Sequence, residues 1–176
     1  MKRFIFIFIM GISLYANKSG IGFYKDGKKI ENSVSKVVTS ENVMGNRVDY
    51  QNDIRERILS FARSKLGSRY VWGATGPNTF DCSGFIQYVF NKSIGITLPR
   101  VSSDQANYKP KISLMSMKKG DLIFFETTGK GRISHVGIYM GEKQFIHASS
   151  GGKKVMVSSL DTDYYMRSFR WGVDPL

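Results

Sequence analysis

The spacing of apolar residues changes partway along the chain, from helical in the middle to strand-like in the last third. Residues 53–66 carry apolar side chains at helical spacing: Ile54, Ile58, Phe61, Ala62 and Leu66. Later, "GDLIFFETT", "RISHVGIYMG" and "KQFIHASS" are short, rich in Ile, Val, Phe and Tyr, and separated by glycine-containing turns. This pattern predicts three successive antiparallel strands. Helices followed by strands indicate an α+β domain, with N-terminal helices packed on an antiparallel sheet.

Cys82 is the only cysteine of the chain and lies in "NTFDCSGFIQYVF", residues 78–90. Because it has no partner for an internal disulfide, it is either a small buried residue or a reactive group. Asp81 is a good helix N-cap and would place Cys82 in the first helical turn. There the unsatisfied N–H groups and the helix dipole favour the thiolate. The sequence therefore predicts a nucleophilic cysteine with a lowered pKa.

The two histidines, His135 and His147, fall on successive predicted strands. Side chains alternate between the faces of a strand, so the turn between the strands decides whether the imidazoles share a face. An odd-length turn centred on Gly141 or Glu142 places them on one face, whereas a two-residue turn places them on opposite faces. With the odd-length turn, Cys82 is the nucleophile, His135 the base and His147 the group that orients the base.

The start of the chain predicts export. Lys2 and Arg3 precede an apolar run over residues 4–12, and small or polar residues follow, which is typical of a signal peptide over residues 1–16. The run is shorter than the roughly 20 residues that span a bilayer, so we expect no transmembrane anchor. We interpret residues 17–52 as a linker or N-terminal arm with one hairpin around residues 26–27. We expect residues 53–176 to form the catalytic domain, with a first helix that begins at Asp53 and ends near Gly67.

The charge balance is strongly basic. The formal charge is +12, and without the predicted signal peptide 24 basic and 14 acidic residues leave +10. This balance favours anionic partners. The basic residues are scattered, with no basic helix or zinc-finger spacing, so we expect no nucleic-acid binding. For an exported protein, we expect the anionic partner to be an acidic cell-wall polymer. We also expect a monomer that is located in the periplasm or outside the cell and is associated with the wall.

Five motifs in this order, "FDCSGFIQYVF", "LPRVSSDQ", "KKGDLIFF", "ISHVGIYMG" and "FIHASS", resemble the NlpC-type family of cell-wall cysteine peptidases. The resemblance covers about 120 residues, from Asp53 to the C-terminus. It implies a compact papain-like α+β fold. It also implies endopeptidase cleavage of peptidoglycan stem peptides, most often between γ-D-glutamate and a diamino acid such as meso-diaminopimelate.

The resemblance also implies roles for individual residues. Cys82 matches the nucleophile, His135 the base and His147 the polar third member. Tyr70, in "RYVWG", matches a tyrosine near the oxyanion site. The residues that flank the cysteine, Asp81 and Ser83, match positions that help bind the stem peptide.

Several alternatives stay open from the sequence alone. Arg100, in "LPRVSS", is either a surface charge or a further substrate contact. One cysteine and two histidines could hold zinc with an open position, but paired-cysteine and His-x-x-x-His spacings are absent, so we expect no metal and no cofactor. A non-catalytic wall-binding module would lack a member of the triad, and none is missing. An amidase acting on a different wall amide would use the same triad.

Overall fold

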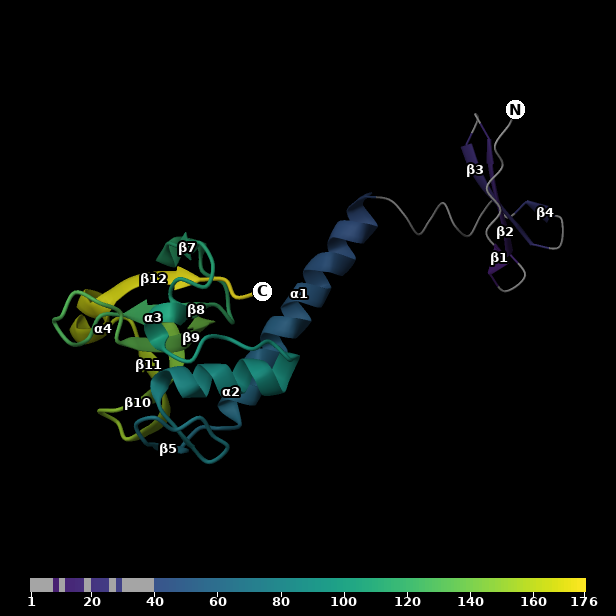
Figure 1. Cartoon of the computed structure of the whole chain (residues 1–176). Helices are drawn as coiled ribbons and strands as arrows, with labels where there is room; N and C mark the ends of the chain where they lie inside the picture. Colours follow the sequence, from purple (N-terminus) through teal and green to yellow (C-terminus); the bar gives the residue numbers. More distant parts are fainter. Residues whose placement is uncertain (1–7, 10–11, 18–19, 26–27, 30–39) are drawn as a thin grey trace. The chain divides into compact units, whose positions relative to one another are not determined.

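The structure is a computed structural model of the 176-residue chain, and it describes residues 8–9, 12–17, 20–25, 28–29 and 40–176 (Figure 1). Side chains are described from residue 47 onward. Contacts within the chain divide it into two units, Met1–Tyr50 and Gln51–Leu176. Helix α1 (Ser40–Arg63) contributes residues to both. Of the described helices, none is long and apolar enough to cross a membrane.

The first unit contains a four-stranded antiparallel sheet. Its strands, in spatial order, are β1 (Phe8–Ile9), β2 (Ile12–Asn17), β3 (Gly20–Lys25) and β4 (Lys28–Lys29). Lys25 lies opposite Lys28, which is the pairing required by the predicted hairpin around residues 26–27. The predicted signal peptide, residues 1–16, falls partly outside the described residues and stays a prediction.

Helix α1 begins earlier than the sequence pattern indicates. The predicted start at Asp53 is wrong, because the helix already begins at Ser40. Residues 40–51 are mostly polar, and Val48 and Tyr50 among them are exposed, so this first half of the helix gives only a weak periodic signal. In its second half Ile58, Leu59 and Ala62 are fully buried. The helix ends at Arg63, shortly before Gly67, whose positive φ of +83° suits the turn that follows.

The second unit is built on an eight-stranded sheet of order β6-β5-β11-β10-β9-β8-β12-β7. All neighbours are antiparallel except β5 and β6, which are parallel. The predicted strands correspond to β8, β9 and β10, and the sheet extends beyond them on both sides. The strands are β5 (Arg69–Tyr70), β6 (Thr79–Phe80), β7 (Lys111–Ile112), β8 (Leu122–Phe125), β9 (His135–Gly141), β10 (Gln144–Ser149), β11 (Lys154–Ser159) and β12 (Phe169–Val173).

Three further helices and one 3₁₀ turn complete this unit (Figure 1). They are α2 (Cys82–Ile94), α3 (Ser102–Gln105), the 3₁₀ turn Leu114–Ser116 and α4 (Asp163–Ser168). Helix α2 packs against β9 and β10 and shares one hydrophobic core with α1. The predicted α+β class, with helices packed on a mostly antiparallel sheet, is confirmed.

The two faces of the sheet bury separate clusters, as strand alternation requires. On β8, Leu122 and Phe124 belong to the core that contains α2, whereas Ile123 and Phe125 belong to a second cluster. Tyr165, from α4, packs against the second cluster. The sheet therefore lies between α2 and α4.

A buried ion pair fixes α1 to the sheet. Arg55 Nη1 donates to Asp121 Oδ1 at 2.6 Å, just before β8, and its Nη2 donates to Asp174 at 2.7 Å near the C-terminus. Removing one partner of such a buried pair typically costs about 3–5 kcal/mol. The contact joins three parts of the chain that are far apart in sequence.

Candidate active site

The N-terminus of α2 is capped as the sequence predicts. Asp81 is the N-cap in extended conformation, and its Oδ1 accepts the N–H of Gly84 at 2.6 Å. Cys82 is therefore the first residue of the helix, and it is 7% exposed. A Cβ on Gly84 would collide with the carbonyl oxygen of Ala74. This explains the glycine of "DCSG", because the preceding loop crosses directly over the helix start.

The charged groups near Cys82 form one hydrogen-bonded cluster. Arg100 donates to both carboxylate oxygens of Asp81, at 3.2 and 2.6 Å. The same guanidinium donates to Ser83 Oγ at 3.0 Å. Asp81 Oδ2 also accepts the backbone N–H of Gly73 at 3.0 Å. Three residues singled out from the sequence therefore meet, and the Arg100 side chain is still 37% exposed.

The surroundings of Cys82 stabilise the thiol. Burial, together with the negative charge of Asp81, raises the pKa of Cys82 to about 11. The backbone N–H groups at the helix start lower it, as expected, but by less. The predicted lowering of the cysteine pKa is therefore wrong for the unliganded protein. The helix start lowers the pKa of Cys82, as predicted, but burial raises this pKa by more.

Tyr70, on β5, lies close to this cluster. Burial and the charges of Cys82 and Asp81 raise the pKa of its phenol to about 12. The hydroxyl therefore stays protonated at neutral pH and can donate a hydrogen bond. This is the property that an oxyanion site requires.

On the sheet, the two histidines are joined by a hydrogen bond. His135 is the first residue of β9, and its Nε2 lies 2.7 Å from Nδ1 of His147 on β10. Nε2 of His147 lies 2.9 Å from Oγ of Ser158 on β11. Side chains from three neighbouring strands, β9, β10 and β11, thus form one hydrogen-bonded network.

A β-bulge, and not the turn length, places the histidines on one face. Gly141 pairs with Gln144 across a two-residue turn of Glu142 and Lys143, with φ of 51° and 58°. A bulge after Gln144 then shifts the register by one residue. The prediction of a shared face is confirmed, whereas the predicted odd-length turn is wrong. The bulge supplies the extra residue that the turn lacks.

A glycine makes room for the histidine pair. A Cβ on Gly137, in the middle of β9, would lie 2.7 Å from the ring of Phe145 and 3.3 Å from Cβ of His147. The first contact is closer than packed carbon atoms approach. Any larger residue would therefore push His147 or its neighbour away from His135.

Burial holds both imidazoles neutral. It lowers the pKa of His135 to about 4, and burial with the adjacent His135 lowers the pKa of His147 to about 2. A neutral imidazole carries one N–H and one acceptor nitrogen. If His135 donates its Nε2–H to His147, then His147 donates its own Nε2–H to Ser158, and Nδ1 of His135 is left as an acceptor. That nitrogen is the proton acceptor that a base requires.

Cys82 and His135 come from elements that pack together, α2 and β9. Between residues 47 and 176, no hydrogen bond joins the Cys82 thiol to either imidazole. Catalytic hydrogen bonds are often long in unliganded enzymes and tighten when substrate binds.

Two groups of the site have no signal in the sequence. Ser158 becomes the partner of His147 only through the pairing of β10 with β11. Tyr165, from α4, packs edge-on against the ring of His147, with 5.6 Å between the ring centroids. Both contacts depend on long-range arrangement.

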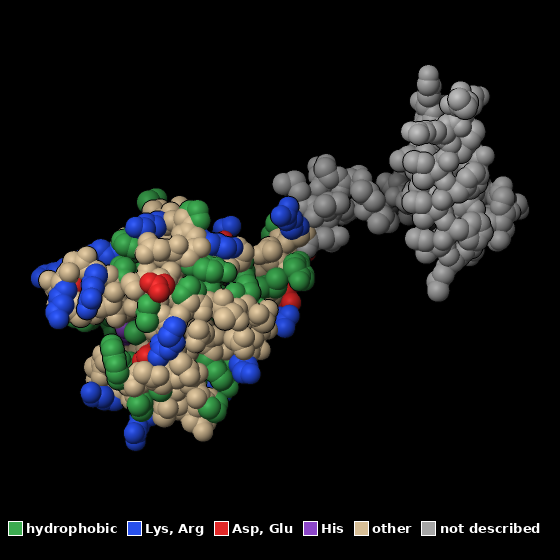
Figure 2. All heavy atoms as spheres, in the orientation of Figure 1, with side chains coloured by type: hydrophobic (Ala, Val, Ile, Leu, Met, Phe, Trp, Pro, Cys, Tyr) green, Lys and Arg blue, Asp and Glu red, His purple; other side chains and the backbone are tan. Residues whose placement is uncertain are grey.

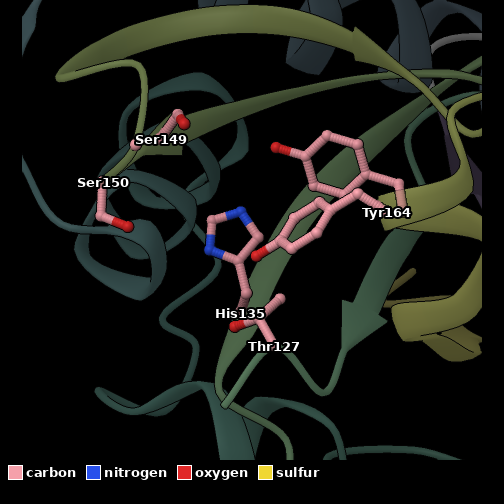
Figure 3. Close-up of a pocket in the computed structure, with 7 residues that line it drawn as sticks. Thr127, His135, Ser149, Ser150 and Tyr164 are labelled. Carbon is pink, nitrogen blue, oxygen red and sulfur yellow. The ribbon is translucent and has the colours of Figure 1, made fainter. Parts of the chain in front are cut away.

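A pocket of about 150 Å³ adjoins His135. In Figure 3, Thr127, Ser149, Ser150 and Tyr164 surround its imidazole. In the part of the chain with described side chains, no group of three or more His, Cys, Asp or Glu residues is placed to hold a metal ion.

The chain resembles several endopeptidases and hydrolases in sequence. It is 52% identical over 97 residues to probable endopeptidase p60 of Listeria innocua, covering 55% of this chain and 20% of that protein. It is 41% identical over 109 residues to γ-DL-glutamyl hydrolase of Bacillus subtilis, covering 61% of this chain and 26% of that protein. It is 30% identical over 154 residues to murein DD-endopeptidase MepS/murein LD-carboxypeptidase of Escherichia coli, covering 88% of this chain and 80% of that protein. The chain thus spans only about a fifth of the Listeria relatives.

The fold has solved counterparts. The crystal structure of the NlpC/p60 domain of peptidoglycan hydrolase SagA matches with a TM-score of 0.60 and 33% identity, over 68% of this chain and 97% of that one. The NlpC/P60 family itself matches residues 67–173, which include Tyr70, Cys82 and both histidines. The match covers more than half of the chain, and this protein therefore belongs to the NlpC/P60 family.

Proposed function

We propose that the protein is a cysteine endopeptidase that cleaves peptidoglycan stem peptides. The observation that carries this proposal is the hydrogen-bonded chain from His135 through His147 to Ser158. It holds a neutral imidazole on the strand that packs against the cysteine helix. The names of two relatives, a murein DD-endopeptidase and the peptidoglycan hydrolase SagA, support peptidoglycan as the substrate.

The reaction would follow the logic of a cysteine–histidine triad. His135 takes the proton of Cys82 as the sulfur attacks the carbonyl carbon of the scissile amide. His135 then gives this proton to the leaving nitrogen, and a thioester to Cys82 remains. Water, activated by the same imidazole, hydrolyses the thioester. Since the cysteine is a thiol at rest, the proton moves during attack.

The helix start would stabilise the negative charge that develops on the carbonyl oxygen. The first N–H groups of α2 have no partner within the helix and can donate to it. The protonated hydroxyl of Tyr70 is a second donor. We therefore propose that Tyr70 belongs to the oxyanion site.

The cluster of Asp81, Ser83 and Arg100 would bind the acyl part of the stem peptide. Both carboxylate oxygens of Asp81 already accept hydrogen bonds from Arg100. The group of the cluster that can bind substrate is therefore the exposed part of the Arg100 guanidinium. A D-glutamate that is linked through its γ-carboxyl keeps a free α-carboxylate, and guanidinium groups bind carboxylates well. We therefore propose cleavage of the γ-D-glutamyl–diamino acid bond, with meso-diaminopimelate as the diamino acid.

The protein would act in the periplasm or outside the cell, on an anionic wall. Figure 2 shows Lys and Arg side chains spread over the visible face of the described part, with few acidic ones. The charge of about +10 after signal removal supports attraction to the wall. We propose that stem peptides still attached to glycan strands are cleaved.

Mass spectrometry of purified peptidoglycan before and after digestion tests these assignments. New fragments ending in γ-D-glutamate and beginning with the diamino acid support the proposed bond. Cleavage between D-amino acids would instead match a murein DD-endopeptidase, and release of whole peptides from glycan would indicate an amidase. Binding without any new fragment would indicate a non-catalytic module.

A second experiment compares the cleavage rates of intact sacculi and of free tetrapeptide at equal bond concentration. It separates cleavage of the cell wall from recycling of free peptides.

A further inference from the structure

The Arg100 side chain projects from a segment that has no helix or strand of its own. Residues 95–101 connect α2 to α3 and belong to neither. Pro99, directly before Arg100, has no N–H group with which to hold the segment in place. The position of the guanidinium beside Asp81 and Ser83 therefore depends on contacts that other parts of the chain make with this segment.

Gln105, on α3, holds the segment on both sides of Arg100. Its side-chain Nε2 donates to the carbonyl oxygen of Pro99 at 2.8 Å, and its backbone N–H donates to that of Val101 at 3.0 Å. The same Nε2 also donates to the carbonyl oxygen of Ser83 at 3.1 Å. One residue thus contacts both chain neighbours of Arg100 and one of the residues that Arg100 binds.

The orientation of the Gln105 amide follows from its neighbours. The side chain is fully buried, and the two groups that it meets are carbonyl oxygens, which only accept hydrogen bonds. The NH₂ group must therefore face them. Within the part of the chain with described side chains, the buried Oε1 has no hydrogen-bond partner. An apolar side chain of similar length would fill the same space without leaving an acceptor unpaired, so packing alone does not explain the glutamine.

We propose that Gln105 is a positioning residue that holds the guanidinium of Arg100 against Ser83 and the start of α2. This inference rests on the proposed function, in which Arg100 binds the free α-carboxylate of the γ-D-glutamyl residue. Gln105 is fully buried and acts on substrate only through Arg100. Its loss should therefore weaken recognition of the carboxylate and leave the chemical step unchanged.

The kinetic test uses two γ-D-glutamyl peptides that differ only at the α-carboxylate, which is free in one and a carboxamide in the other. The variant is Gln105→Met, because methionine has a similar length and cannot donate a hydrogen bond. On the free acid, KM should rise roughly 3–10-fold, as expected for one lost hydrogen bond, and kcat should stay unchanged. On the carboxamide, neither parameter should change. An unchanged KM on the acid, or equal rises on both peptides, would overturn the proposal.

A double variant tests whether Gln105 acts through Arg100. Residues that act through one shared contact are not additive. In the Arg100→Ala background, the further change Gln105→Met should therefore leave KM on the acid where Arg100→Ala has put it. A further rise of the same size as in the single variant would show that Gln105 acts independently of Arg100, and the proposal would fail.

Gln87→Met is the matched control. Gln87 Nε2 donates to the carbonyl oxygen of Leu98 at 2.9 Å, so the same kind of bond ties α2 to the same segment, two residues before Arg100. KM on the acid should rise less than in Gln105→Met. Thermal unfolding checks that both variants are folded. Equal rises would mean that any loosening of the segment has this effect, and would overturn a specific role for Gln105.

A measurement without substrate separates failure of the positioning role from failure of the proposed function. A guanidinium held by Asp81 and Ser83 rotates slowly about its Nε–Cζ bond, so its two Nη groups give separate nitrogen NMR signals, which Arg100→Ala identifies. These signals should stay separate in Gln87→Met and merge in Gln105→Met. Separate signals in Gln105→Met would overturn the positioning role, whether or not any peptide is cleaved. Merged signals in a protein that cleaves neither peptide would reject the proposed function alone.

Discussion

At the start of α2, Cys82 lies beside an ion pair of Asp81 and Arg100, whereas the groups behind His135 on the sheet are neutral. We call the first set the cysteine end (Cys82, Asp81, Ser83 and Arg100) and the second the histidine end (His135, His147 and Ser158). The cysteine end is held by an ion pair whose arginine is 37% exposed. At the histidine end, His147 is fully buried.

The difference indicates a division of tasks. Charged, partly exposed groups can recognise an anionic substrate and exchange partners with it. A buried, neutral network does not attract ions, and it fixes the tautomer and orientation of the base. A carboxylate in place of His147 would favour the charged imidazolium, whereas a neutral imidazole leaves the pKa of His135 low. We therefore propose that recognition and proton transfer are supported by different elements of the fold.

Replacing the reactive group at either end should have the largest effect. Cys82→Ala should abolish turnover, because no nucleophile remains. His135→Ala should lower kcat by about 10²–10⁴-fold, the usual contribution of a general base. Initial rates on muropeptides measure both, and circular dichroism checks that each variant is folded. Wild-type turnover in either variant would show that the two ends do not form one site.

Within the histidine end, His147→Ala should lower kcat less than His135→Ala, on the order of 10²-fold, since His147 only orients the base. His147→Gln should restore part of this loss, because its amide oxygen can accept the Nε2–H of His135. The same rate assay measures both changes. A loss much greater than that of His135→Ala would reverse the two roles.

At the cysteine end, Arg100→Ala should lower kcat/KM by roughly 10-fold, mainly by raising KM, because a charge-assisted contact to substrate is lost. Arg100→Lys should lie in between, since lysine keeps the charge but not the two-pronged geometry. The matched control is Arg167→Ala, which removes a fully solvated ion pair on α4. A fall in kcat with unchanged KM would place Arg100 in the chemical step.

The smallest effect should come from Ser158→Ala, a few-fold loss of kcat. The variant removes one neutral hydrogen bond, worth about 0.5–1.5 kcal/mol, from the far end of the network. KM should not change, because Ser158 lies behind His147. Steady-state kinetics separate the two parameters, and a raised KM would assign Ser158 to substrate binding instead.

The local parts of this site were predictable from the sequence. The capping aspartate and an apolar stripe are short-range signals, and the stripe residues of α2 are all buried, as predicted: Phe85, Ile86, Val89 and Phe90. Strand alternation predicted a shared face for the two histidines only with an odd-length turn, and the turn has two residues. The bulge that produces the shared face was not predicted, because a bulge leaves no distinct sequence pattern.

The remaining features depend on the packed structure. The lowered cysteine pKa was predicted from the helix start alone, and burial beside Asp81 reverses it. Ser158 and Tyr165 approach His147 from a later strand and a later helix. The early start of α1 lies in a mostly polar stretch, residues 40–51, with few apolar residues. The pKa of Cys82 and the approach of Ser158 and Tyr165 to His147 depend on contacts that no local window contains.

The central claim is that His135 accepts the proton of Cys82, although no hydrogen bond joins them at rest. The direct test is the pH dependence of iodoacetamide alkylation of Cys82 in the wild type and in His135→Ala. With its pKa raised to about 11, an unassisted thiol reacts slowly at pH 7 and faster as the pH rises toward 11. His135 is neutral above about pH 4, so it can assist across the neutral range. We predict that the wild type reacts at least about 10-fold faster than His135→Ala at pH 7, and that the two rates converge near pH 11. Identical profiles at every pH would contradict the account.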